Sequence, residues 1–217
     1  MTPDRQSFYF VRHGQREDFD DPGWKARAER PHDPPLSATG FRQAEDVARV
    51  LRSHRLDALY SSPFLRALQT AAPVAEALNL PIRVEPAFCE WLNPAWLDRV
   101  PDLPDARTAQ RQFPRIDPDY APIGRAVFPE HAEAQEVWER VGHALREIIR
   151  RTPSENVVIV AHGSPLGQAF GFLIPQVPGV HLEVASITRV DREGGQFRLV
   201  HSGIAHLRDP DSTLRFH

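Results

Sequence analysis

Cysteine and lysine are almost missing from this 217-residue chain, which has one of each, Cys89 and Lys25. A single cysteine excludes an intrachain disulfide and a metal cluster held by several cysteines. Because there is only one lysine, nearly all of the positive charge is carried by arginine. Any anion that this chain binds is therefore expected to meet planar guanidinium groups, which can donate two parallel hydrogen bonds.

Long apolar runs and a strong net charge are missing as well. No apolar segment is long enough to span a bilayer. Residues 1–6 lead into the first predicted strand without the basic and apolar regions of a secretion signal. The formal net charge of -3 gives no reason to expect nucleic acid or an anionic membrane as a partner. We therefore expect a cytoplasmic protein.

Short apolar segments predict six strands. The unbroken runs Phe8–Val11 and Val157–Ala161 are typical of parallel strands that are buried on both faces of a sheet. The other predicted strands are Leu56–Tyr60, Pro81–Val84, Ala185–Val190 and Gln196–His201. The turn Glu193-Gly194-Gly195 is expected to join the last two strands as a hairpin.

Apolar residues at helical spacing predict helices between these strands. Ser37 is expected to cap one helix. Ser62-Pro63 and Ser164-Pro165 are expected to begin two more, with serine as the cap and proline at the first helical position. The clearest helical pattern covers residues 130–151. The alternation predicts an α/β fold: a three-layer α/β/α sandwich with a largely parallel central sheet and helices on both faces.

Two segments interrupt this alternation. Residues 17–35 are polar and are expected to form a long loop over the functional site. Residues 92–129 are rich in proline and show no long periodic pattern. Structureless connections of this length are usually lids or insertions. We expect a single domain over residues 1–217, with 92–129 as an insertion or lid over the site.

Polar residues follow the ends of three predicted strands. Arg12 and His13 follow the first strand, Arg66 lies in the first turn after the second, and His162 follows the fourth. In α/β sheets ligands bind beyond the carboxyl ends of the strands, and a helix N-terminus favours an anion. Gly14 permits a sharp turn and a close backbone approach. These residues predict a compact cationic site suited to phosphate.

Several motifs occur in one order along the chain. They are Val11-Arg12-His13-Gly14, Leu36-Ser37-Ala38-Thr39-Gly40 with Gln43-Ala44, Ser61 to Ala71, Val160-Ala161-His162-Gly163 and Ala185-Ser186-Ile187-Thr188. Together they resemble the histidine phosphatase superfamily, also called the phosphoglycerate mutase-like family. The segments 12–16, 83–86 and 90–91 are most similar to the suppressor-of-T-cell-receptor-signalling and ecdysteroid-phosphate phosphatase branch. Gln15, where that branch usually has glutamate, and the segment 92–129 depart from it.

The resemblance implies a phosphomonoester hydrolase that uses no metal or other cofactor. Its nucleophile would be His13, whose neutral imidazole attacks phosphorus and forms a phosphohistidine. Arg12 and Arg66 would clamp the phosphate oxygens. His162, protonated while substrate is bound, would donate a hydrogen bond to the same group. Arg16 would add a further phosphate contact.

A carboxyl group is needed to protonate the leaving group and then to deprotonate water. We predict that Glu90 has this role, with Glu85 as its competitor and with Glu17 and Asp18 as weaker candidates. The two histidines of the motifs also suggest a metal pair. We reject that interpretation because no carboxylate has a matching spacing in the sequence and the family uses no metal.

Two other functions remain as alternatives. A phosphoglycerate mutase would use the same phosphohistidine, but residues 15–19 lack the Glu-Ser-x-Trp-Asn stretch typical of mutases. A non-catalytic phospholigand-binding protein is the second alternative, against which His13 and Glu90 argue. The expected partner is a phosphorylated small molecule or a phosphoprotein, and the sequence does not determine which one or the oligomeric state.

Overall fold

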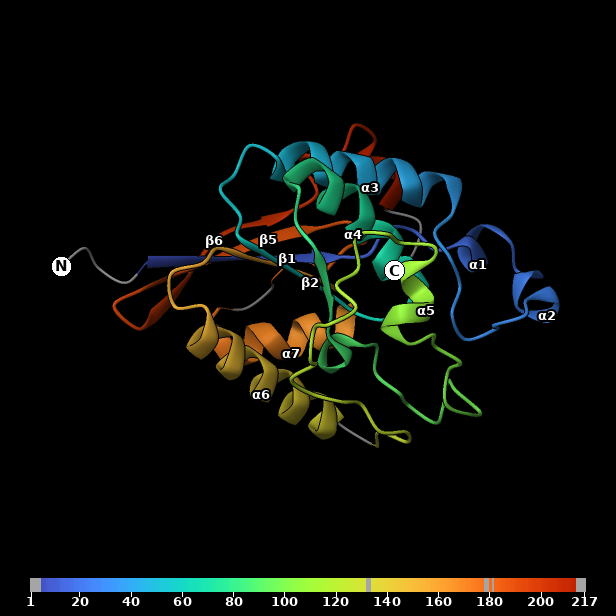
Figure 1. Cartoon of the computed structure of the whole chain (residues 1–217). Helices are drawn as coiled ribbons and strands as arrows, with labels where there is room; N and C mark the ends of the chain where they lie inside the picture. The colour runs from blue at the N-terminus through green and yellow to red at the C-terminus, as the bar shows by residue number, and fades with distance from the viewer. Residues whose placement is uncertain (1–4, 132–133, 178–179, 181, 214–217) are drawn as a thin grey trace.

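The computed structural model describes residues 5–131, 134–177, 180 and 182–213. At its centre is a six-stranded sheet with the strand order β3-β2-β4-β1-β5-β6 (Figure 1). The strands are β1 (Arg5–Arg12), β2 (Ala58–Ser61), β3 (Ile82–Val84), β4 (Val157–Ala161), β5 (Ile187–Glu193) and β6 (Gln196–Gly203).

The sheet is mixed, with one strand running against the others. β1 and β2 each pair with β4 in parallel, and β3 pairs with β2 in parallel, whereas β5 is antiparallel to β1 and β6 is antiparallel to β5. The expected hairpin between β5 and β6 turns at Gly194 and Gly195, whose φ angles of 58° and 82° lie in the region that favours glycine. The prediction of a largely parallel sheet is confirmed.

Helices cover both faces of this sheet (Figure 1). One layer is formed by α3 (Ala38–Leu51) and α4 (Leu65–Leu78), and the other by α6 (Gln135–Arg151) and α7 (Gly163–Leu173). Side chains alternate along a strand, so in β4 Val158 and Val160 join the core under α3 and α4, while Val157 and Ile159 join the core under α6 and α7. The three-layer sandwich predicted from the sequence is confirmed.

The remaining elements are short and lie in the irregular segments. They are α1 (Glu17–Asp20), α2 (Trp24–Arg27), α5 (Ala106–Gln110) and the 3-10 turns η1 (Pro86–Phe88) and η3 (Pro210–Thr213). The expected loop 17–35 therefore contains two single-turn helices. Among the described residues, every helix is too short or too polar to cross a membrane.

The predicted starts of α4 and α7 are wrong. α4 begins at Leu65, and Asp33 takes over the expected capping role, because its Oδ1 accepts the Leu65 N–H at 2.8 Å. Ser62 instead shares a 2.7 Å hydrogen bond with Nε2 of His162, which occupies its hydroxyl. α7 begins at Gly163, so Ser164 is its second residue and not its cap, and Pro165 is its third residue and not its first.

The other two helix predictions have different outcomes. Ser37 caps α3 as expected, because its Oγ accepts the Gly40 N–H at 3.2 Å. α6 begins at Gln135 and not at residue 130. Glu130 is 1% exposed and is held outside the helix by a buried ion pair with Arg140.

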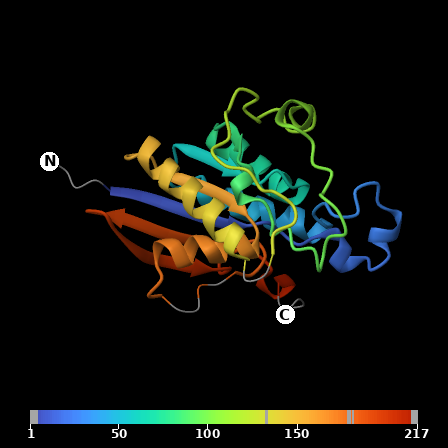
Figure 2. The ribbon, with the colours of Figure 1, turned by 90° about the horizontal axis from the view of Figure 1, so that it is seen from below.

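The segment 92–129 lies beside the loop 17–35, at the end of the molecule where β1 terminates (Figure 2). Part of it packs on the core: Phe113 and Ile116 are buried, and Ile116 forms an isolated parallel bridge with Ile82 of β3. This contact covers part of the outer edge of β3. That the segment acts as a lid on a single domain stays a prediction.

The turn after β1 packs against the start of α3 with almost no space between the backbones. A Cβ atom on Gly40 would lie 2.1 Å from the Gln15 carbonyl oxygen, and one on Gly14 would lie 2.7 Å from the Gly40 oxygen. The Ser37 N–H donates to the Gln15 carbonyl at 2.9 Å across this contact. The expected close approach at Gly14 is confirmed, and it sets the direction in which the chain leaves β1.

We expect Gly40→Ala to destabilise the protein by about 1–3 kcal/mol, because the added methyl group forces the two backbones apart. Gly167→Ala is the matched control. It also adds a methyl group to a helix, but its nearest neighbour is 3.7 Å away. The control should be neutral or stabilising by ~0.5–1 kcal/mol. Urea unfolding of both variants measures the difference, and equal stability would contradict the close contact.

Candidate active site

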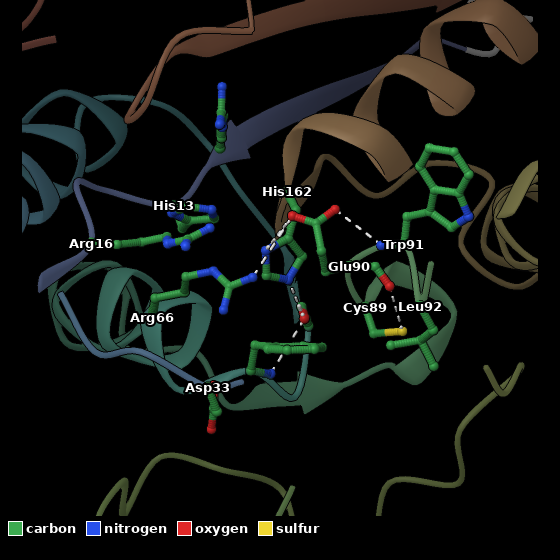
Figure 3. Close-up of polar contacts among 12 residues, drawn as sticks. His13, Arg16, Asp33, Arg66, Cys89, Glu90, Trp91, Leu92 and His162 are labelled. Atoms are coloured by element: carbon green, nitrogen blue, oxygen red, sulfur yellow. Dashed lines mark hydrogen bonds and ion pairs between the residues drawn. The ribbon is translucent and has the colours of Figure 1, made fainter. Parts of the chain in front are cut away.

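Residues from four elements meet at the carboxyl ends of β1 and β4. In the parallel pairing of these strands Arg12 lies opposite Ala161, so the next residues, His13 and His162, come side by side. Their ring centroids are 5.0 Å apart. Arg66 enters from the first turn of α4, and Glu90 enters from the turn after η1 (Figure 3). The four residues predicted from three distant motifs, together with Glu90, thus form one site.

The imidazole of His13 is oriented by the backbone beside it. Its Nδ1 lies 2.7 Å from the Gly14 carbonyl oxygen, which can only accept a hydrogen bond, so Nδ1 carries the proton. Nε2 then keeps its lone pair. Burial, and next the charges of Arg66 and Arg12, hold the pKa of His13 well below its usual value. Its neutral form is therefore the stable one at pH 7.

Two arginines bring buried positive charge to the histidines. Arg66 is 2% exposed, and burial lowers its pKa to about 10, which leaves it charged at neutral pH. Arg12 donates from Nη1 to the Leu182 carbonyl oxygen. Within the described part of the chain, Nε and Nη1 of Arg66 and Nε of Arg12 are buried without a hydrogen-bond partner. Buried donors of this kind need an acceptor.

The ring of His162 is fully buried and is fixed by Ser62. The Ser62 oxygen accepts the Phe64 N–H at 3.3 Å, so its own proton is available to Nε2 of His162 at 2.7 Å. The proton of the neutral ring then lies on Nδ1. Burial, followed by the charge of Arg66, lowers the pKa of His162 well below its usual value. The neutral ring therefore presents an Nδ1–H donor to the site.

Glu90 is the carboxylate that lies next to Arg66 and His162. Its Oε1 accepts the Trp91 N–H at 3.0 Å, and its Oε2 lies 3.7 Å from Arg66 Nη2 and 3.7 Å from His162 Nδ1. The side chain is 22% exposed, so it borders both the buried residues and the cavity. This position fits a group that exchanges protons with substrate and water.

The same geometry corrects the argument made against a metal ion. His13, Glu90 and His162 each offer a ligand atom, and these atoms lie within 4.8 Å of one another. A carboxylate with suitable placement therefore exists, although the sequence spacing did not reveal it. The charges of Arg12 and Arg66 beside this triad oppose a divalent cation and favour an anion.

Glu85, the competing candidate for the general acid, is occupied elsewhere. Its carboxylate is fully buried and accepts hydrogen bonds from the Ala87, Ile123 and Gly124 N–H groups at 3.0, 2.7 and 3.0 Å. The Tyr120 hydroxyl donates a fourth at 2.7 Å, and burial together with the Glu85 charge raises the pKa of Tyr120. Glu85 thus ties the segment 92–129 to the turn after β3.

Arg16 stands at the edge of the site, paired with a carboxylate from its own loop. It donates from Nε and Nη2 to Asp18 at 2.8 and 2.5 Å, and its guanidinium lies 4.4 Å from the centre of the Phe19 ring. Asp18, one of the weaker candidates for the general acid, is thus engaged in an ion pair with Arg16. Glu17, the other, begins α1.

A cavity of about 350 Å³ opens beside Glu90 and Arg66. Trp91 and Trp96 form one wall with ring centroids 5.1 Å apart. The loop 17–35 and the segment 92–129 meet across it, since His32 Nε2 lies 2.6 Å from Asp98 Oδ1. The cavity is lined by Arg16, Asp18, Lys25, Pro31, His32, Pro34, Phe64, Arg66, Glu90, Trp91, Trp96 and Leu97.

Sequence reasoning missed two residues that orient the site. Asp33 holds the start of α4 and is 2% exposed, and burial raises its pKa. In the sequence, nothing distinguished Asp33 from the other acidic residues of the polar loop 17–35. Thr70 donates to the Arg66 carbonyl at 2.8 Å and accepts the Gly14 N–H at 3.1 Å, which links α4 to the turn after β1. Thr70 belonged to a recognised motif, which could have indicated its role.

The chain is similar to known proteins over most of its length. The family model described as histidine phosphatase superfamily (branch 1) matches residues 8–205. The chain is 28% identical over 200 residues to the human ubiquitin-associated and SH3 domain-containing protein A, covering 81% of this chain and 30% of that protein. It is 25% identical over 254 residues to the ecdysteroid-phosphate phosphatase of Drosophila melanogaster, covering 94% of this chain and 33% of the relative.

One solved structure supports the fold. The ecdysone phosphate phosphatase from Bombix mori, in complex with tungstate, superposes with a TM-score of 0.74 at 20% identity. The match covers 90% of this chain and 92% of that one. The chain spans only about a third of the length of the two curated relatives described above.

The two buried histidines predict how stability depends on pH. Their folded-state pKa values lie below the unfolded value of about 6.5. Below that pH the unfolded chain binds more protons, so the free energy of unfolding falls as the pH falls, by up to ~1.4 kcal/mol per pH unit for each histidine. We expect Tm to fall between about pH 7 and pH 5.5.

His162→Gln should reduce the slope of Tm against pH, because one of the two buried groups is removed. His143→Gln, which changes an exposed histidine of α6, is the matched control and should keep the slope of the unmodified protein. The slopes, and not the absolute Tm values, are compared, since the buried substitution also disturbs packing. Identical slopes in all three proteins would show that the buried histidines do not cause the pH dependence.

Proposed function

Because the chain belongs to the histidine phosphatase superfamily, we propose that it hydrolyses phosphate monoesters through a phosphohistidine formed on His13. Family membership and the phosphatase relatives support phosphatase or mutase activity. The choice of hydrolysis, and the role of each residue, are our inferences from the geometry of the site.

One observation carries this proposal. Four donor atoms of the site are buried without a hydrogen-bond partner among the described residues: Nε and Nη1 of Arg66, Nε of Arg12 and Nδ1 of His162. They indicate that the site binds a group with several acceptor atoms. A phosphoryl group offers several oxygens at once, and planar guanidinium groups match their spacing. His13 stands beside these donors with its Nε2 lone pair free. The site is therefore built to hold a phosphate against a nucleophile.

The reaction takes two steps in this arrangement. In the first, Nε2 of His13 attacks phosphorus, a P–N bond forms, and the bond to the leaving oxygen breaks while Glu90 gives that oxygen a proton. In the second, Glu90 takes a proton from water, which attacks phosphorus, breaks the P–N bond and releases inorganic phosphate. Arg12 and Arg66 neutralise the charge that develops on the phosphoryl oxygens in both transition states.

His162 and Arg16 have supporting roles in the proposal. A bound phosphate dianion raises the proton affinity of His162, so the residue that is neutral in the free protein can become a charged donor when substrate is bound. Arg16, which donates from Nε and Nη2 to Asp18, would add a further phosphate contact from the edge of the site. No cofactor is part of this mechanism, because the arginines supply the positive charge that a metal would otherwise provide.

The walls of the cavity indicate where the rest of the substrate lies. Trp91, Trp96 and Leu97 offer apolar surface next to Glu90, and Lys25 lies on the lining as well. A leaving group with an apolar part, on a small molecule or on a phosphoprotein, fits this composition.

We place the activity in the cytoplasm. A mutase would have to retain the intermediate for a second acceptor, and a binding protein would not need Glu90.

The nucleophile is tested by trapping the intermediate. We expect His13→Ala to lower kcat on nitrophenyl phosphate by about 10³-fold or more. When the unmodified protein is quenched rapidly without acid during turnover, it should carry bound phosphate that is labile in acid and stable in alkali. His143→Ala, an exposed histidine, is the control. The trapping is repeated with EDTA, which should change neither rate nor yield. Turnover by the His13 variant, or recovery of lost activity by added metal ions, would refute the mechanism.

Glu90 is tested by the basicity of the leaving group. An alkyl phosphate leaves as a strongly basic alkoxide and needs a proton, whereas a nitrophenyl phosphate does not. Glu90→Gln should lower kcat on the alkyl ester by roughly 10²–10⁴-fold and much less on the nitrophenyl ester, with KM little changed. Glu85→Gln is the comparison. Equal losses of kcat on both esters would show that Glu90 positions another group and does not donate the proton.

A further inference from the structure

A buried ion pair lies behind the turn that carries Glu90. Arg140, from the first half of α6, and Glu130, from the segment before it, are 7% and 1% exposed. Arg140 donates from Nε to Glu130 Oε1 at 2.6 Å and from Nη2 to Oε2 at 3.0 Å. The pair is thus a two-bond fork between a guanidinium and a carboxylate.

The remaining hydrogen bonds of this pair all go to the backbone around Glu90. Arg140 donates from Nη1 to the Ala87 carbonyl at 2.5 Å and from Nη2 to the Glu90 carbonyl at 3.2 Å. Glu130 Oε2 accepts the Leu92 N–H at 2.8 Å, and the Glu130 N–H donates to the Leu92 carbonyl at 2.9 Å. The chain is therefore held before Glu90, at Glu90 and after it.

The stability of the fold gives little reason for such a pair. Removing two charges from water is costly, and apolar side chains of similar volume often stabilise a protein equally well. What an apolar pair cannot do is accept the Leu92 N–H and donate to two carbonyl groups. The contacts made by Arg140 and Glu130 therefore have a geometric result, which is a rigid backbone at Glu90.

This rigidity reaches the carboxyl group of Glu90. Its Oε1 is bound by the N–H of Trp91 within the same turn, so the position of the turn determines where Oε2 points. Oε2 lies 3.7 Å from both Arg66 and His162, on the side of the site where the leaving group must stand. A shift of the turn would move the proton donor away from the phosphoryl group while leaving in place the backbone that carries Arg66 in α4 and His162 after β4.

We propose that Arg140 and Glu130 are positioning residues for proton transfer by Glu90. This inference rests on the proposed function and adds to it a device, 40 to 50 residues further along the chain, that the motifs did not indicate. The pair itself contacts neither His13 nor the arginines that bind phosphate in the bonds described. Its loss should therefore impair the proton transfer and spare the attack on phosphorus.

The experiment compares kcat on an alkyl phosphate and on nitrophenyl phosphate. Arg140→Lys keeps the charge but cannot form the fork and reach both carbonyl groups. Because a displacement of about 1 Å can cost ~10²-fold in rate, we expect kcat on the alkyl ester to fall by about 10–100-fold. The nitrophenyl ester, whose leaving group needs no proton, should lose only a few-fold. KM and inhibition by vanadate should stay close to those of the unmodified protein.

Glu130→Gln is the second variant, because it removes one of the two carboxylate acceptors while keeping the volume, and it should show the same selectivity. Arg189→Lys is the matched control. Arg189 makes a similar two-bond fork with Asp191 at 2.8 and 2.9 Å in the middle of β5, and it makes no hydrogen bond to the turn at Glu90. Arg189→Lys should lower kcat on both esters by the same factor, and only to the extent that it lowers Tm.

The outcomes separate this inference from the proposed function. If Glu90→Gln is selective for the alkyl ester and both Arg140→Lys and Glu130→Gln lower kcat equally on the two esters, the pair only stabilises the fold and the inference is overturned. If Glu90→Gln itself lacks selectivity, the general acid is wrong and the positioning role falls with it. Selective loss in all three variants, with the Arg189 control unselective, supports it.

Discussion

Positive charge buried beside two histidines is the constraint on which this site depends. Arg66, His13 and His162 are each no more than 2% exposed, and Arg12 adds a second guanidinium at the end of β1. Burial and the arginine charges lower the pKa of both histidines, so that these rings stay neutral while the arginines stay charged. A neutral nucleophile next to fixed cations is what an attack on an anionic phosphate ester requires.

The buried carboxylates around the site hold the backbone from which its residues project. Asp33 accepts the Leu65 N–H and fixes the start of α4, from which Arg66 projects. Glu85 binds four donors and ties the segment 92–129 to the turn after β3. Glu130, with Arg140, encloses the turn at Glu90. Buried negative charge around the candidate site thus serves to position the segments that carry Arg66 and Glu90.

Much of the fold could be predicted from local pattern. The runs Phe8–Val11 and Val157–Ala161 are apolar throughout, and short runs of this kind are typical of strands buried on both faces of a sheet. The errors came where a tertiary contact competes with a local preference. Ser62 has the chemistry of a helix cap, but its hydroxyl pairs with His162, and Asp33, 32 residues away in the chain, supplies the acceptor for Leu65.

By itself, the sequence determined which residue types stand at the strand ends: Arg12 and His13 after one strand and His162 after another, because the end of an apolar run is a local property. Only the tertiary structure decided which carboxylate joins them. Glu85 and Glu90 lie five residues apart and are chemically almost alike, yet one is enclosed by four donors and the other faces the histidines. That difference arises from packing between distant segments, which no local pattern in the sequence encodes.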